Sequence, residues 1–83
     1  MKLYDLMYVM QGSKYNTYPR IWIADYGTGG GTFGTEGDFG YVDDVLNLKN
    51  DEEYSYLLDA EVTGIDFTKC ADGSLCLDIE VQS

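Results

Sequence analysis

The chain contains no histidine, so the side chain most often used as a general base and as a transition-metal ligand is missing. No serine or cysteine stands in a recognisable nucleophile motif. Carboxylates are the most abundant groups that could do chemistry, with fifteen Asp and Glu residues against five Lys and Arg. This inventory predicts a protein that is not an enzyme. A catalytic carboxylate pair is the alternative from the enzyme class.

The two cysteines, Cys70 and Cys76, fall on the same outward face of a predicted hairpin, opposite or diagonal according to its register. A cross-strand disulfide is therefore geometrically conceivable. Two free thiols are expected in a reducing cytosol. A zinc site would need two more soft ligands that the chain does not supply. We expect no metal and no cofactor.

A glycine-rich stretch covers residues 27–40, in which seven of fourteen residues are glycine. Within it, residues 29–34 match the string G-x-G-x-x-G after a predicted strand. A dinucleotide site also needs a helix that opens there and a surrounding βαβ unit, and the pattern provides neither. No basic residue between Gly27 and Leu48 could meet a phosphate. We therefore expect a flexible loop or a Gly-kinked hairpin strand, and favour a hairpin partner for the preceding strand.

Charge is the most distinctive property of the chain, because the formal net charge is −10 and it is unevenly distributed. Residues 1–24 sum to +2 and residues 25–83 to −12. Carboxylates arrayed over a small rigid body can imitate a phosphate backbone and dock on a surface rich in Lys and Arg. The same charge could serve solubility alone. The acids predicted to bind a partner are Glu36, Asp38, Asp43, Asp44, Asp51, Glu52, Glu53, Asp66, Asp78 and Glu80.

Tyrosine is the other abundant recognition residue, with eight in the chain. Tyr15 and Tyr18 lie in a polar stretch after Gly12, so we expect them outside the core and in the partner-binding surface. A tyrosine-rich surface could equally bind a second copy of the chain.

Size and charge limit the remaining classes of function. Eighty-three residues, 45% of them hydrophobic, predict a single small domain over residues 1–83. Strong negative charge disfavours direct binding to nucleic acid and to anionic membranes. All apolar runs are far shorter than the roughly 20 residues of a membrane-spanning helix. We expect a cytoplasmic protein.

The N-terminal two thirds of the chain predict helices around one strand. Leu3, Leu6, Met7 and Met10 recur at helical spacing over residues 1–11, and Gly12 provides a stop. Residues 20–26 read as a strand with its isoleucines on one side and Arg20 and Trp22 on the other. Residues 42–46 show one helical turn. Asn50 with Glu53 resembles a capping box that opens a short helix through Leu58, burying Tyr54, Leu57 and Leu58.

The C-terminal third predicts a hairpin, because apolar and polar residues alternate over residues 65–68 and 75–82. Placing all odd-numbered apolar residues on one face requires a three-residue connection, residues 71–73, with Gly73 in the left-handed conformation. The even-numbered face should be wet and carry Asp66, Asp78 and Glu80. The sum is an α+β domain: a small antiparallel sheet packed on an N-terminal helix and short middle helices.

Four short motifs resemble small acidic proteins encoded by phages and mobile elements of gut Firmicutes. They are residues 1–7 (MKLYDLM), 20–25 (RIWIAD), 57–62 (LLDAEV) and 72–75 (DGSL), while the glycine-rich residues 27–40 depart from the expected compact turn. Proteins of this setting include anti-CRISPR proteins and other inhibitors of host defence, many of them acidic and without enzymatic activity. The resemblance implies such an inhibitor and carries over no functional residues.

The sequence thus leads to two functional hypotheses from different classes. The first is a phage-type, anti-CRISPR-like inhibitor that binds a basic nucleic-acid-handling protein, such as an RNA-guided nuclease, by charge mimicry of nucleic acid. The alternative is a non-catalytic structural or accessory domain that associates with itself through a sheet edge or its Tyr-rich helix.

Overall fold

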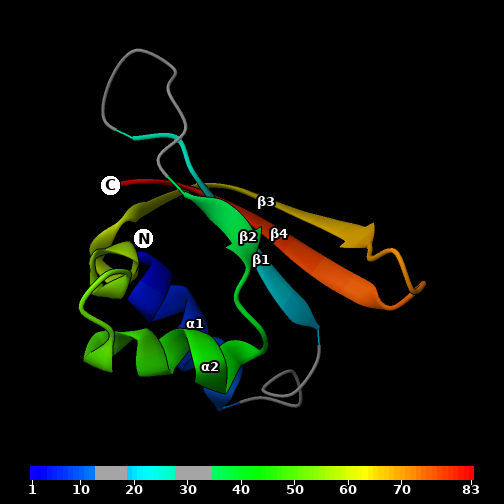
Figure 1. Cartoon of the computed structure of the whole chain (residues 1–83), viewed down its shortest axis with the longest axis horizontal. Coiled ribbons are helices and arrows are strands. Elements are labelled where there is room, and N and C mark those ends of the chain that lie inside the picture. Colours follow the sequence, from blue (N-terminus) through cyan, green and yellow to red (C-terminus); the bar gives the residue numbers. More distant parts are fainter. Residues whose placement is uncertain (13–18, 28–34) are drawn as a thin grey trace.

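A computed structural model describes residues 1–12, 19–27 and 35–83 of the chain. It contains one four-stranded sheet in the order β2-β1-β4-β3. The strands are β1 (Arg20–Asp25), β2 (Glu36–Asp38), β3 (Glu61–Lys69) and β4 (Leu75–Gln82). Two α-helices, α1 (Leu3–Gln11) and α2 (Val42–Leu46), and two 3₁₀ helices, η1 (Asn47–Asn50) and η2 (Ser55–Asp59), form a layer beside the sheet (Figure 1). The predicted α+β class is confirmed.

The sheet is mixed, whereas an antiparallel sheet was expected. β1 pairs antiparallel with β2, and β4 pairs antiparallel with β3, but β1 and β4 run parallel at the centre. Side-chain alternation indicates which face of a strand is buried, but it does not indicate which strands lie beside it. The hairpin of β3 and β4 returns beside β1 only after the helical segment, so this pairing joins strands that are distant in sequence.

The expected faces of β1 and its expected hairpin partner are confirmed. Ile21 and Ile23 of β1 are fully buried, while Arg20 and Trp22 are half-buried on the other side. Residues 36–38 of the glycine-rich stretch form β2, the hairpin partner of β1. The G-x-G-x-x-G string, residues 29–34, lies outside the described residues.

The helical layer packs an apolar core against the sheet. Leu3 and Met7 of α1 are fully buried and meet core residues of both central strands in one cluster. Each such side chain contributes about 1.5–3 kcal/mol relative to exposure. α1 ends at Gln11, as predicted, but its C-cap Gly12 has φ −81°, so this stop does not use the left-handed conformation.

The middle segment differs from the prediction in how it is capped. Residues 42–46 form the expected turn of helix, α2. The capping box at Asn50 and Glu53 is wrong, because the carboxylate of Asp51 instead accepts hydrogen bonds from the backbone N–H groups of Glu53 and Tyr54 at 2.8 and 3.1 Å. The following helix is the 3₁₀ helix η2, which buries Leu57 and Leu58 as expected, whereas Tyr54 is only half-buried against the core.

The C-terminal hairpin has the predicted register. Phe67 lies opposite Leu77 and Ile65 opposite Ile79, with residues 71–73 as the connection between Cys70 and Ser74. Gly73 has φ +87°, the left-handed conformation that a non-glycine residue adopts at a cost. All the odd-numbered apolar residues therefore share one face.

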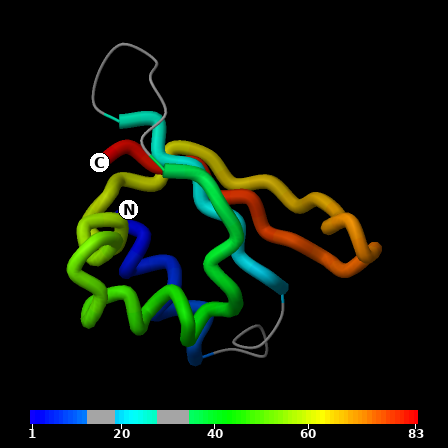
Figure 2. Tube along the Cα trace, in the orientation of Figure 1, coloured from blue at the N-terminus to red at the C-terminus, as the bar shows by residue number. Residues whose placement is uncertain are grey.

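The hairpin projects past the helical layer (Figures 1 and 2). Its apolar face is consequently covered at one end only: Ile79 and Val81 are fully buried, whereas Ile65 is 49% and Phe67 62% exposed. Alternation predicts the face that is apolar and does not tell how far a covering layer reaches. Within the described residues, no helix has the length and apolar character needed to cross a membrane.

Candidate protein-binding surface

The register of the four strands brings predicted acids together on the sheet face opposite the helices. Asp38, Trp22, Asp78 and Asp66 form one row across β2, β1, β4 and β3, because each is the direct partner of the next. Glu80 follows Asp78 by two residues on the same face. We call this surface, made of Asp38, Asp66, Asp78 and Glu80 around Trp22, the acidic sheet face.

The spacing of these carboxylates is set by the strands. Residues two apart on one strand lie about 6.6 Å apart, and directly opposed residues about 5 Å. Gly64 is opposite Glu80, and a Cβ built on it would come within 2.9 Å of the Glu80 Oε2 atom. The missing side chain of Gly64 thus leaves room for the Glu80 carboxylate over β3. The result is a regularly spaced array of carboxylates on the sheet.

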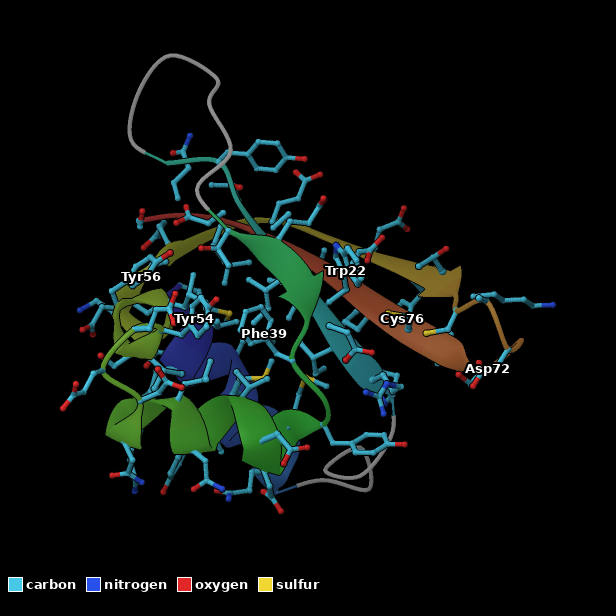
Figure 3. All side chains as sticks on the ribbon, viewed as in Figure 1. Trp22, Phe39, Tyr54, Tyr56, Asp72 and Cys76 are labelled. Carbon is cyan, nitrogen blue, oxygen red and sulfur yellow. The ribbon has the colours of Figure 1, made fainter. Side chains whose placement is uncertain are left out.

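A pocket of about 520 Å³ lies on this face beside the hairpin loop, with Arg20, Trp22, Cys76, Asp78 and Thr68 among its lining residues. Figure 3 shows Trp22, Cys76 and Asp72 toward the hairpin side, apart from Phe39, Tyr54 and Tyr56. A half-buried tryptophan surrounded by carboxylates combines an apolar anchor with a charged rim, the arrangement typical of a protein-binding hot spot.

Arg20 compensates one of the four acids. Its Nε and Nη2 atoms donate hydrogen bonds to the two carboxylate oxygens of Asp38 at 2.8 and 3.0 Å. The Arg20 hydrogen bond is the main cause that holds the pKa of Asp38 below its usual range. Arg20 also lies 5.2 Å from the centre of the Tyr41 ring. Asp38 is therefore the acid of this face least able to attract a cation from outside.

The other three acids, Asp66, Asp78 and Glu80, have no ion pair with any residue that the structure describes. Asp66 and Asp78 are also directly opposed, and like charges in that position destabilise a sheet. Their arrangement costs stability without a compensating cation within the described chain. Local costs of this kind are expected at surfaces kept for binding.

The remaining predicted acids lie in or beside the helical layer. Asp43 accepts a hydrogen bond from Gln11 at 3.1 Å, and Asp44 caps α2 by accepting one from the backbone N–H of Tyr41 at 3.0 Å. Asp51 caps the turn before η2, and Glu52 is exposed in that turn. The structure thus places these four predicted acids on the helical side of the molecule, and three of them, Asp43, Asp44 and Asp51, have structural contacts there.

Glu36 lies on β2 two residues before Asp38 and opposite Ala24, which also pairs with Glu80, and Glu53 lies in the turn before η2. They line a second pocket, of about 470 Å³, together with Thr35, Tyr54 and Tyr56. The pKa of Tyr54 is raised, mainly by the negative charge of Glu53. Tyr15 and Tyr18, also predicted to bind a partner, lie outside the described residues.

Neither cysteine forms a disulfide in the structure. They lie diagonally in the hairpin, since Cys76 is opposite Thr68 and Cys70 is next to the connection. Cys76 was expected on a wet face, yet it is buried with 4% exposed area. Burial, followed by its contact with Cys70, raises the pKa of the Cys76 thiol to about 11. No cluster of metal-ligating side chains occurs among residues 1–12, 19–27 and 35–83.

Sequence reasoning missed Arg20 and Trp22 as members of this surface. The alternation in residues 20–25 places both on one side of β1, which is the available signal. That signal becomes informative only when β1 is known to lie between β2 and β4. No family model and no curated protein matches the chain, and no solved structure matches it either.

Proposed function

We propose that this chain is a non-catalytic inhibitor that docks its acidic sheet face on the basic, nucleic-acid-binding surface of another protein. The observation that carries the proposal is the set of three carboxylates, Asp66, Asp78 and Glu80, held on a rigid sheet without a cation partner among the described residues. Such an array offers a basic groove the negative charge it normally receives from phosphates.

The partner in this proposal is a nucleic-acid-handling enzyme of a host defence system, of which an RNA-guided nuclease is an example. Its positively charged channel holds nucleic acid through backbone contacts and charge, so a rigid acidic surface can compete for it. Trp22 supplies the apolar contact at the centre of the surface. Complementary charge around it increases the association rate and orients the partner.

The test is capture followed by competition. The tagged chain is incubated with bacterial lysate, and bound protein is eluted by a salt gradient and identified by mass spectrometry. The proposal expects one nucleic-acid-processing enzyme, released by moderate salt and displaced by added DNA, whose activity on nucleic acid falls when the purified chain is added. A partner that DNA does not displace, or whose binding salt leaves unchanged, contradicts charge mimicry.

A further inference from the structure

The edge of β3 that faces away from β4 has no strand partner beyond Val62 among the described residues, and it is a second candidate for an interface. β3 is the terminal strand of the sheet, and its first residues are covered by the chain's N-terminus: Lys2 is bridged to Glu61, and Val62 N–H donates to Met1 C=O at 2.8 Å. On its other side, β3 pairs with β4. An open strand edge is a template for pairing with another strand.

The hairpin geometry identifies which backbone groups face this edge. Cys70 N–H donates to Ser74 C=O at 2.8 Å, and hydrogen-bonded pairs alternate along an antiparallel ladder. Asp66 and Thr68 therefore direct their backbone groups to β4, while Ile65, Phe67 and Lys69 direct theirs outward. The hydrogen bond of the Phe67 N–H supports this assignment, because the N–H donates to the Asp66 side chain at 2.9 Å and not to a backbone group of β4.

Two of the three outward-facing residues, Ile65 and Phe67, have apolar side chains, and the third is Lys69. Phe67 and Ile65 are 62% and 49% exposed. They border a groove of about 440 Å³ between the hairpin and α1, lined also by Leu6, Met10 and Leu77. None of its described lining residues carries a charge. The groove offers a basic partner no opposite charge, and a second copy with net charge −10 meets no carboxylate on its described lining.

We infer that two copies of this chain pair through β3, antiparallel about a two-fold axis at Phe67. Phe67 is the middle one of the three outward-facing residues, so this register pairs it with itself and pairs Ile65 with Lys69 of the second copy. Each of these pairs exchanges two backbone hydrogen bonds. On the other face, Asp66 meets Thr68 of the second copy, so no carboxylate opposes a carboxylate in the paired stretch.

Pairing requires the Asp66 carboxylate to release the Phe67 N–H, which the carbonyl of Phe67 in the second copy then accepts. The product is one continuous eight-stranded sheet, since each copy contributes four strands. The two acidic sheet faces join across the axis into one surface. This dimer forms whether or not the proposed partner exists.

The test measures mass and amide exchange on the full chain. Sedimentation equilibrium across a concentration series should show a shift from the 9.3 kDa chain to twice that mass. The shift should strengthen between about 0.1 M and about 1 M salt, because screening weakens the repulsion between two negative copies. Docking of the acidic sheet face on a basic partner should instead weaken with salt. The opposite salt dependences distinguish a failure of the dimer from a failure of the proposed function.

Phe67→Glu should weaken the dimer at least tenfold. Tyr8→Glu is its matched control, because Tyr8 is also 62% exposed. Tyr8 follows Leu6 by two residues on α1, so its side chain points to the opposite side of the helix from the groove that Leu6 lines. Independently of any substitution, the amide exchange of Ile65, Phe67 and Lys69 should slow with rising concentration, while that of Asp66 and Thr68 stays constant. A wild-type mass that stays at one chain, equal effects of the two variants, or unchanged exchange at Phe67 overturns the inference.

Discussion

Asp25 is the charged side chain that the structure buries most deeply among the described residues, with 1% exposed area. Its Oδ1 atom accepts hydrogen bonds from the backbone N–H groups of Gly27 and Ser83, at 2.9 and 3.1 Å. A single carboxylate thus joins the end of β1 to the residue that follows β4. The sequence shows Asp25 only as the polar end of a strand.

Replacing Asp25 should therefore affect stability and leave the acidic sheet face intact. Asp25→Ala leaves two backbone donors without their acceptor and should lower the free energy of unfolding by about 1–3 kcal/mol. Asp25→Asn keeps an oxygen acceptor and should cost less. Urea denaturation followed by circular dichroism measures both, and an alanine variant as stable as the wild type would contradict this role.

Cys76 should be unreactive in the folded chain, because burial raises its thiol pKa from 9.0 to about 11 and only the thiolate is nucleophilic. A raised pKa favours folding while the thiol is protonated. This contribution is fully present below pH 9.0 and is lost as the pH rises through the folded pKa of about 11. Alkylation by iodoacetamide, mapped by mass spectrometry, should modify Cys76 much more slowly in the folded chain than in denaturant. Equal rates would refute the assignment.

At the scale of elements, the start of α2 depends on Gly40. Its φ is +86°, and a Cβ at this position would meet the side chain of Asp44, which caps the helix. Gly40→Ala should lower the free energy of unfolding by about 1–2 kcal/mol from the left-handed conformation alone. Gly37→Ala is the control, because a Cβ there has no neighbour within 4 Å. Thermal denaturation compares the two, and equal loss at both sites would contradict the argument.

The elements predicted from sequence are those whose signal is local. The amphipathic spacing of α1, the alternation in β3 and β4 and the turn at Gly73 each depend on neighbouring residues, and all three are confirmed. The parallel pairing of β1 with β4 joins residues over fifty positions apart and has no local signal. The exposure of Phe67 depends on where the helical layer ends, which is likewise a property of the assembled fold.

The candidate surface was predictable to the same extent. Alternation placed Asp66, Asp78 and Glu80 together on one hairpin face, because they lie on adjacent strands of one hairpin. It could not add Trp22 and Asp38, which reach that face through strand order. Alternation also could not separate the acids of the sheet face from Asp44 and Asp51, whose capping contacts depend on local turn geometry.

For the molecule as a whole, negative charge occurs on two sides with different contacts. Asp66, Asp78 and Glu80 lie on adjacent strands of the sheet face, whereas Asp43, Asp44 and Asp51 of the helical side accept hydrogen bonds that cap or connect its turns, and none of these six acids has an ion pair with a described residue. If net charge served solubility alone, the position of a removed carboxylate would not matter. If the acidic sheet face binds the partner, the affinity should depend on which carboxylates are removed.

Binding by two variants of equal net charge tests this most directly. Asp66→Asn, Asp78→Asn and Glu80→Gln together remove three charges from the acidic sheet face, and Asp43→Asn, Glu52→Gln and Glu53→Gln remove three from the helical side. With the captured enzyme and matched salt, the first variant should lose roughly tenfold or more in affinity, while the second stays within about threefold of the wild type. Equal losses in both variants, or a loss confined to the second, would contradict docking through the sheet face.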